Sequence, residues 1–474
     1  MVITMKKFLS VTLCLLMVAA LVFSGCTTGG GTAGGAATTA GGGAAATTAK
    51  AAGGSGSASS SGAKKNVELQ TWANAPVVNF FKSQIGPFSE AYPDYTLVVA
   101  DAQNEEHDSV KQTRISAGNV DIVCFQQFGK PQEDWNKKYY NMPLWQQFIE
   151  EGLLLDLTNY DFTKNYIKKC LDDNSYNGKY YCLPTGTVAL NGMYYSVEIF
   201  DKLGLSVPET WDEFINCCET IKNAGYGVIT AGGADQWPLN MYASFIITSF
   251  YTEDECRQIG KDMLMGKAKY TDPFFTEAYK AMEQFASYLE PGVSGIMYAD
   301  IAGRLVQGHV AMMCGHIPTT PYIVEADPNF KFGYFVLPGK TKPADGKPKQ
   351  FAIKYDLTLC VASNAPNKDG ALAFLEFFSR KDVYTAFVNA SGFSPTQPDI
   401  TVASEFMNSL APHLVAPQMD YGNYSFSPKG IGEYGGAALN FFYLDVLGGP
   451  FSAKELAEKA AQDYTDALAA LDKL

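Results

Sequence analysis

A segment between residues 232 and 240 carries residue types suited to holding a small polar ligand. It runs Gly-Gly-Ala-Asp-Gln-Trp-Pro-Leu-Asn. Its two glycines leave the backbone free to approach another group closely. Asp235 and Asn240 offer hydrogen-bonding groups, and Trp237 offers a flat ring face. Carboxylates and amides pair with hydroxyls, and an aromatic face stacks on the apolar side of a sugar ring, so the segment favours carbohydrate binding. A place in the hydrophobic core is the alternative for Trp237.

Polar residues also follow two strand-like segments, 67–72 and 120–125. Asn74 comes two residues after the first segment, and Gln126 and Gln127 come directly after the second. In open α/β sheets, ligands bind at the carboxyl ends of strands. We therefore expect these three side chains to line a ligand site.

Two aromatic residues fit either a site or a core. Trp72 closes the first strand-like segment, where the core interpretation is nearly as strong as the site interpretation. Tyr355 lies near a predicted crossing of the chain between two lobes, where it either lines the ligand cleft or packs in the core.

The chain lacks the residue spacings of common catalytic, metal and cofactor sites. Its four histidines show no H-E-x-x-H pattern, and no G-x-S-x-G occurs. A G-x-G-x-x-G match at 430–435 follows Ser427-Pro428 in a polar stretch, not a strand. A calcium-like stretch from Asp173 has Ser175 at a ligand position and Pro184 where a glutamate is needed. We predict no cofactor and no metal, and a binding protein, not an enzyme.

Carboxylates are abundant in the chain, so one enzymatic alternative stays open. A glycosidase needs two carboxylates held across a bond in space, and spacing along a sequence does not test this. A secreted glycoside-active enzyme and a surface sugar sensor or adhesin are therefore the alternatives.

Composition argues against nucleic acid as a partner. The 474 residues include 36 Lys and Arg and 49 Asp and Glu. Residues 1–65 hold five of the lysines and no acid, so residues 66–474 carry 31 basic and 49 acidic side chains, a net charge of −18. A field of this sign repels a phosphate backbone.

The first 65 residues predict export and membrane attachment. Lys6-Lys7 precede an apolar run of 16 residues from Phe8 to Phe23, which is shorter than the roughly 20 residues that span a bilayer. Residues 1–25 therefore form a predicted signal peptide. Leu21-Val22-Phe23-Ser24-Gly25-Cys26 resembles the bacterial lipobox, in which the cysteine is lipidated. A chance cysteine after an apolar run is the alternative for Cys26.

Residues 26–65 are predicted to be a lipidated cysteine followed by a flexible tether. From Thr27 to Lys65 the chain has 12 glycines among Ala, Thr and Ser, with no aromatic residue, Leu, Ile, Val or Met. Such a composition cannot bury a core. We expect an extracytoplasmic protein anchored to the outer face of a bacterial cell membrane.

Eight cysteines lie in the remaining chain, with irregular spacings and no Cys-x-x-Cys pair. Several sit in apolar runs, where a buried thiol acts as a small hydrophobe. Disulfides are the alternative, because exported proteins form them. The eight are Cys124, Cys170, Cys182, Cys217, Cys218, Cys256, Cys314 and Cys360.

Strand-like and helix-like segments alternate after residue 66. Strands are predicted at 67–72, 95–99 and 120–125, with helices at 77–91 and 107–116 between them. This order predicts parallel pairing with helices on the sheet faces, an α/β fold. Thr210 and Glu213 form a predicted capping box at one helix start, and Ser452 and Glu455 form another before a helix that runs to Leu474.

Several motifs occur in the order found in one protein family. They are the lipobox, Ala117-Gly118-Asn119-Val120-Asp121-Ile122-Val123, Gly178-Lys179-Tyr180-Tyr181-Cys182-Leu183-Pro184, Pro208-Glu209-Thr210-Trp211-Asp212-Glu213, Gln307-Gly308-His309-Val310-Ala311-Met312 and Leu337-Pro338-Gly339. Together they cover nearly all of 66–474, and this chain resembles extracellular solute-binding proteins of the carbohydrate type, relatives of maltose-binding protein.

The resemblance implies a two-lobe, periplasmic-binding-protein-like fold of type II with a multi-strand hinge. The lobes would close on a carbohydrate ligand and present it to the permease subunits of an ABC importer. By analogy, lobe one spans 66–187 and 353–393, and lobe two spans 188–352 and 394–474. The chain departs from the family pattern at Val120, where proline is common, and at His316, where the family often has a stacking tryptophan. His316 is therefore expected at the ligand site in place of that ring.

Overall fold

The computed structural model describes residues 64–473, apart from the side chains of Asn104 and Glu105. The described residues belong to one compact unit. The predicted signal peptide, Cys26 and the tether up to residue 63 lie outside the described residues.

A six-stranded sheet organises the first part of this unit. The order is β12-β11-β3-β1-β2, and β6 also pairs with β11. β1 is parallel to β2 and to β3, which confirms the predicted parallel pairing. β11 is antiparallel to β3 and β6. The strands are β1 (Lys65–Trp72), β2 (Tyr95–Ala102), β3 (Ile122–Phe125), β6 (Leu183–Ala189), β11 (Ala352–Val361) and β12 (Gln418–Met419).

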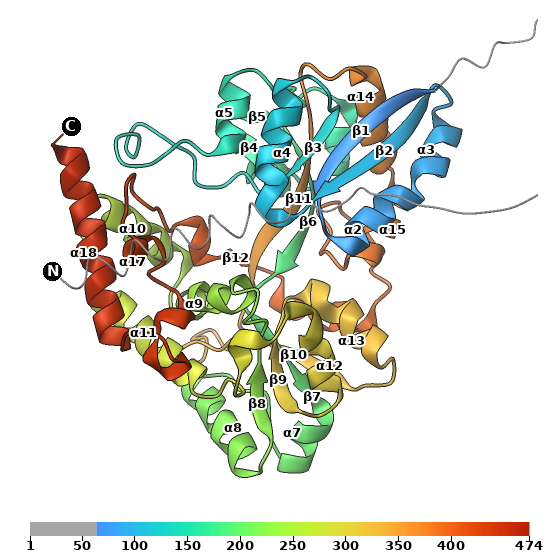
Figure 1. Ribbon diagram of the computed structural model, residues 1–474. Helices are drawn as coiled ribbons and strands as arrows, with labels where there is room; N and C mark the ends of the chain where they lie inside the picture. The colour runs from blue at the N-terminus through green and yellow to red at the C-terminus, as the bar shows by residue number, and fades with distance from the viewer. Residues whose placement is uncertain (1–63, 474) are drawn as a thin grey trace, which may run out of the picture. The chain divides into compact units, whose positions relative to one another are not determined.

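Helices cover both faces of this sheet (Figure 1). On one face, phenylalanines from four helices interlock over Val67 and Leu69, with Phe81 and Phe387 stacked at 6.0 Å. These helices are α2 (Ala75–Ser83), α3 (Ile85–Ala91), α14 (Lys368–Phe378) and α15 (Lys381–Ser391). The other face buries Val123 and Phe125 with residues of α4 (Asn104–Ser116) and α5 (Leu144–Glu150).

Residues 77–91 were expected to form one helix and form parts of two. α2 ends at Ser83, and Gln84 caps it before α3 begins. Pro87 explains the break, because proline has no N–H to donate to the preceding turn and its ring crowds the carbonyl there.

A second sheet has four strands in the order β10-β7-β9-β8. β8 is parallel to β9, and β7 is antiparallel to both β9 and β10. The strands are β7 (Gly192–Ser196), β8 (Gly227–Thr230), β9 (Val310–Cys314) and β10 (Phe332–Val336). A short hairpin is formed by β4 (Ser175–Tyr176) and β5 (Lys179–Tyr180).

The other helices lie mainly around the second sheet and in the C-terminal part (Figure 1). They are α6 (Lys168–Asp172), α7 (Val197–Leu203), α8 (Trp211–Asn223), α9 (Trp237–Phe250), α10 (Glu253–Leu264), α11 (Pro273–Ala286), α12 (Ile301–Val306), α13 (Thr320–Ala326), α16 (Glu405–Ser409), α17 (Glu433–Gly436) and α18 (Ala453–Asp472). None of the helices within 64–473 is both long and apolar enough to cross a membrane.

The two predicted capping boxes differ. Ser452 and Glu455 form a complete box at the start of α18, as predicted. At α8, Thr210 Oγ1 accepts the backbone N–H of Glu213 at 3.2 Å, but the Glu213 carboxylate accepts the N–H of Glu209 at 2.8 Å instead of that of Thr210. The box prediction was therefore half right, because the carboxylate reaches one residue further back.

The chain passes between the two sheets at a set of hydrogen-bonded positions. Leu190 and Asn191 connect β6 to β7, and residues 337–351 lead from β10 back to β11. The Asn191 side chain accepts the N–H of Ala352 at 2.7 Å, and its backbone carbonyl accepts the N–H of Leu337 at 2.6 Å. Asn191 therefore ties the outward and return passages together. The exact lobe limits at 187/188, 352/353 and 393/394 stay predictions.

Candidate ligand-binding site

Three aromatic side chains gather where β8 and β9 end. Trp237 follows the loop after β8, His316 follows β9, and Tyr298 comes from a short 3-10 turn before α12. The ring centroids lie 5.0 Å apart for Trp237 and Tyr298, 5.7 Å for Trp237 and His316, and 6.2 Å for Tyr298 and His316. Because parallel neighbouring strands end at the same sheet edge, this is the position at which α/β sheets bind ligands. We call these three residues the aromatic cluster.

Glycines allow the loop after β8 to pack beside Tyr298. A Cβ on Gly232 would lie 2.8 Å from the Tyr298 Cα, and one on Gly233 would collide with the Val293 carbonyl oxygen. The close approach lets Ala234 donate its N–H to Ile296 at 2.9 Å. Only residues without a side chain fit there, so the glycine pair sets the geometry of the cluster.

Asp235 positions Tyr298. Its Oδ2 accepts the backbone N–H of Tyr298 at 2.6 Å. The Tyr298 hydroxyl is also held, 2.6 Å from Thr319 Oγ1. Asp235 therefore acts on the cluster through Tyr298.

Exposure favours the site interpretation of Trp237 over the core interpretation. Trp237 is 41% exposed, whereas Trp72 is only 6% exposed. Large aromatic side chains are usually well buried, so an exposed indole held against two other rings is an available stacking surface.

His316 is neutral at physiological pH. Its pKa is lowered to about 4, mainly by burial and in part by the positive charge of Lys354, while Asp356 opposes the shift. Its Nδ1 is buried and has no hydrogen-bond partner among the described residues. A neutral imidazole with a free ring nitrogen can accept or donate a hydrogen bond according to its tautomer.

Lys354 and Asp356 add charged groups beside the cluster. They lie on β11 and form an ion pair of 2.7 Å, with 22% and 13% of their side chains exposed. Both influence His316 electrostatically. Neither was singled out from the sequence, and the register of β11 is irregular between Tyr355 and Leu357, where simple alternation does not assign faces.

Tyr355 itself is buried at 2% exposure, and its hydroxyl donates to Asp173 Oδ2 at 2.6 Å. Its backbone N–H donates to Gln127 Oε1 at 3.1 Å, and Gln127 Nε2 donates to Asn423. The structure thus uses Gln127 and Tyr355 in contacts within the protein, and their burial and bonding favour a structural role over ligand contact. Gln126 is exposed.

The remaining sequence-predicted residues serve the fold. Trp72 packs edge-on against His107 at 5.5 Å in the core. Asn74 is the N-cap of α2 and accepts the N–H of Val77 at 3.4 Å. Asn240 accepts the N–H of Phe441 at 3.1 Å. Thus Trp237 and His316 meet in the cluster and Asp235 supports it, whereas these three do not join it.

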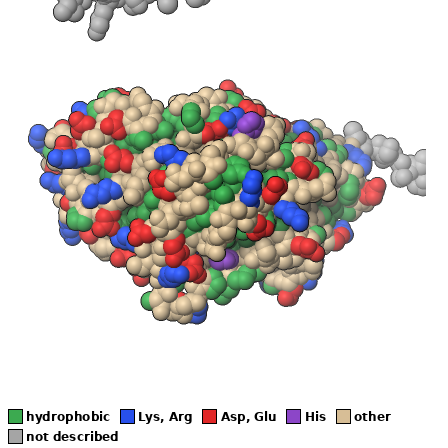
Figure 2. Space-filling model, turned by 90° about the horizontal axis from the view of Figure 1, so that it is seen from below, with side chains coloured by type: hydrophobic (Ala, Val, Ile, Leu, Met, Phe, Trp, Pro, Cys, Tyr) green, Lys and Arg blue, Asp and Glu red, His purple; other side chains and the backbone are tan. Residues whose placement is uncertain are grey.

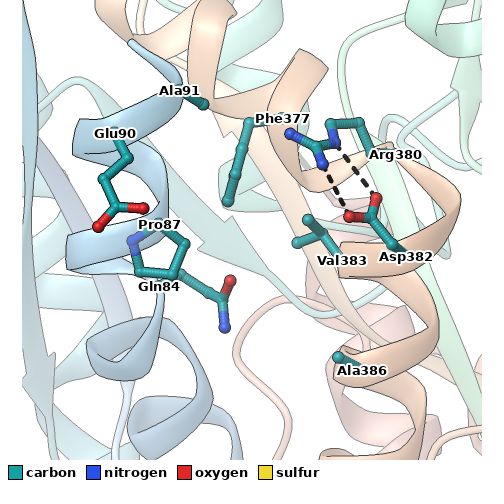
Figure 3. Close-up of a pocket in the computed structure, with 9 residues that line it drawn as sticks. All are labelled: Gln84, Pro87, Glu90, Ala91, Phe377, Arg380, Asp382, Val383 and Ala386. Carbon is teal, nitrogen blue, oxygen red and sulfur yellow. Dashed lines mark hydrogen bonds and ion pairs between the residues drawn. The ribbon is translucent and has the colours of Figure 1, made fainter. Parts of the chain in front are cut away.

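A cavity of about 440 Å³ lies elsewhere, between α3 and α15 (Figure 3). The Arg380 guanidinium is paired with Asp382 at 2.7 Å and lies over the Phe377 ring. The lining residues are Gln84, Pro87, Glu90, Ala91, Phe377, Arg380, Asp382, Val383 and Ala386. None of them belongs to the carboxyl edges of β8 or β9, so this cavity is separate from the candidate site.

Charges are mixed on the surface. Figure 2 shows acidic and basic side chains interspersed with apolar ones over the face seen there. Within residues 64–473, no group of three or more His, Cys, Asp or Glu side chains is placed to hold a metal ion.

The comparisons with known proteins decide the family. Residues 68–385 match the family described as bacterial extracellular solute-binding protein. The chain belongs to this family.

The solute-binding protein is 28% identical over 219 residues to an uncharacterized ABC transporter extracellular-binding protein of Pyrococcus horikoshii, covering 43% of this chain and 50% of that one. It is 23% identical to the multiple sugar-binding protein of Streptococcus mutans, covering 60% of this chain and 64% of that one. The chain therefore spans about half to two thirds of these curated relatives.

Solved structures share the two-lobe fold. Apo RafE from Streptococcus pneumoniae superposes with a TM-score of 0.65 at 23% identity, covering 87% of this chain and 99% of that one. A chitin oligosaccharide binding protein superposes with a TM-score of 0.67 at 18% identity, covering 86% and 100%. These structures confirm the predicted type II fold for this solute-binding protein.

Proposed function

We propose that this solute-binding protein captures a sugar or oligosaccharide between its lobes and delivers it to an ABC importer. The observation that carries the proposal is the exposed Trp237 ring, held beside Tyr298 and His316 at the carboxyl edge of β8 and β9. The names of two relatives support the class of ligand, because one is a multiple sugar-binding protein and another a melibiose, raffinose and stachyose-binding protein.

The side chains around the cluster suit the chemistry of a sugar. A pyranose ring has an apolar face that stacks on indole, and its hydroxyls need donors and acceptors around its edge. Neutral His316 offers one ring nitrogen, and the Lys354–Asp356 pair offers an ammonium and a carboxylate. Charge-assisted hydrogen bonds to hydroxyls are stronger than neutral ones, so these groups would select for a polyhydroxylated ligand.

We further propose that Cys26 carries a lipid and that the 27–65 tether links it to the folded unit. The lipobox-like residues and the glycine-rich composition support this, and both lie outside the described residues. Cys26→Ala should release the protein into the medium or leave an uncleaved precursor. Unchanged membrane association together with normal processing would refute the anchor.

A panel of monosaccharides and oligosaccharides tests the sugar proposal. Each is added to the purified chain, and the melting temperature is measured. A specific sugar at 100 times its Kd should stabilise the fold by about 2.7 kcal/mol. The same samples are assayed for released reducing sugar, because turnover would favour a glycoside-active enzyme. Isothermal titration with each sugar is the second measurement. No stabilisation and no heat of binding across the panel would refute carbohydrate as the ligand.

A further inference from the structure

Two cysteines face each other across the strands that connect the sheets. β6 and β11 are antiparallel, and Leu183 pairs with Leu359. Cys182 directly precedes β6, and continuing this register by one residue places it opposite Cys360. Both are buried, at 1% and 0% exposure, and the structure holds both as free thiols.

The two side chains lie on the same face of the sheet and in contact. Both belong to the core cluster that contains Val123 and Trp145. Burial and the neighbouring Cys182 thiol both raise the pKa of Cys360. Directly opposed residues on antiparallel strands have Cβ atoms about 4.5–5.5 Å apart. A disulfide needs about 3.5–4.5 Å, so an adjustment of roughly 1 Å suffices.

The neighbouring thiol is excluded as a partner by the register. Cys124 on β3 pairs with Leu359, so its side chain points to the opposite face from that of Cys360. Cys124 lies in the other core cluster. The geometry therefore selects one pair among the three cysteines of this sheet.

We propose that Cys182 and Cys360 form a disulfide in the exported protein. In the reaction, the two thiols lose two protons and two electrons, and a new S–S bond forms. The electrons reduce the disulfide of a thiol–disulfide oxidoreductase of the cell envelope to two thiols, through a mixed disulfide. The thiolate is the attacking form and burial disfavours it, so the exchange takes place before the chain has closed around these residues.

The bond joins both ends of one long insertion. β6 leads out to the four-stranded sheet, and β11 is the strand on which the chain returns from it. All four strands of that sheet lie between residues 182 and 360. The disulfide would fasten the base of this insertion to the six-stranded sheet, while the passages at Asn191 and Ala352 remain free to bend. Cross-links that close long loops restrict the unfolded chain most.

Mass spectrometry of the exported full chain tests the bond. Free thiols are alkylated under denaturing conditions at harvest, and the chain is digested without reductant. We expect one linked peptide that contains Cys182 and Cys360, two hydrogens lighter than its separate halves, with the other body cysteines alkylated. Alkylation of both Cys182 and Cys360 before reduction would show that the exported protein holds them as free thiols, and would overturn the proposal.

Refolding in vitro tests the geometry of the cysteine pair independently of the redox conditions of the cell envelope. The reduced, denatured chain is refolded with oxidised and reduced glutathione, and the linked peptides are mapped. Formation of the 182–360 link ahead of other pairs supports the proposed geometry, and a different or random set of links overturns it. Neither result depends on sugar binding, so failure here is distinguishable from failure of the proposed function.

Thermal melting with matched variants gives an independent readout. Reductant should lower the Tm of the oxidised wild-type chain by roughly 3–6 °C. Cys182→Ala and Cys360→Ala should lose this response, whereas Cys124→Ala, a buried thiol on the other face, should keep it. Loss of the response in Cys124→Ala alone would overturn the assignment. If the alanine variants fail to fold, the peptide map of the wild-type chain decides.

Discussion

Asp235 and Tyr298 stand 63 residues apart in the chain and meet through one hydrogen bond, in which the Tyr298 backbone N–H donates to Asp235 Oδ2 at 2.6 Å. This bond fixes the 3-10 turn that carries Tyr298 beside the loop that carries Trp237. The position of one ring of the aromatic cluster therefore depends on a carboxylate from the neighbouring loop.

Asp235→Ala should weaken sugar binding by roughly fivefold, because a hydrogen bond to a charged group contributes about 1.5–3 kcal/mol and part of its loss is absorbed by relaxation of the turn. Isothermal titration with the sugar identified by the panel measures the change. Asp254→Ala removes an exposed carboxylate from α10 and is the control. Equal affinity in the Asp235 variant and wild type would show that the bond does not position the site.

Trp237→Ala and Trp72→Ala should have opposite profiles. Trp237 is 41% exposed, so its loss should cost about 1–3 kcal/mol of binding and leave the Tm nearly unchanged. Trp72 is 6% exposed, so its loss should destabilise the fold by about 3–5 kcal/mol through the cavity it leaves. Calorimetry and thermal melting on both variants measure the two effects. If Trp237→Ala melts far lower and binds normally when folded, Trp237 is a core residue.

These two tryptophans show what sequence patterns predict and what they do not. Buried strands such as 120–125 were predictable because apolar runs between turn residues fit only a covered sheet. The exposure of a single tryptophan depends on which segments pack around it. Tyr298 was missed for the same reason, since nothing in its local sequence indicates that Gly232 and Asp235 will hold it.

Residues placed directly after strands gave mixed results for a related physical reason. Asn74 follows β1 and caps α2, because an amide at a helix start satisfies an unpaired N–H there. His316, which was expected at the site from the family resemblance, also follows a strand, β9, and lies in the aromatic cluster. A position after a strand places a residue at the edge of the sheet. The tertiary packing decides whether its polar group bonds to the protein itself or stays available to a ligand. Lys354 and Asp356 lie where the register of β11 is irregular, so strand alternation alone does not identify them.

Stability should fall as the pH drops from about 7 to 4, in part through His316. Its pKa is lowered to about 4 in the folded protein, below the unfolded value of about 6.5. Between these values the unfolded chain binds the additional proton, so stability is fully present above about 6.5 and is lost as the pH falls towards 4. By linkage this contribution is at most roughly 3–4 kcal/mol.

His316→Gln removes this titration and should flatten the dependence of Tm on pH between 7 and 4. Burial also lowers the pKa of His107, with Lys111 adding to the effect, so the variant should retain part of the slope. The two chains differ at this residue alone, so the difference between variant and wild type reports its contribution. Identical slopes in the two proteins would show that His316 is not buried as a neutral ring.

Ligand should draw the two lobes together about the passages near Leu190, Ala352 and Pro395. Hinge closure requires only a few residues to change φ and ψ, and the hydrogen bonds of Asn191 keep two of the passages adjacent while they do so. Closure would bury a sugar between the aromatic cluster and the lobe that carries Gln126, which is exposed.

Small-angle scattering of the purified chain, with and without the sugar found in the panel, measures the radius of gyration. We expect a smaller radius with ligand. The Trp237→Ala variant serves as the control at a ligand concentration that only just saturates the wild type, where its lower affinity should leave a larger fraction of the variant open. An unchanged radius under saturation confirmed by calorimetry would mean that one lobe holds the ligand alone, and the hinge assignment would be wrong.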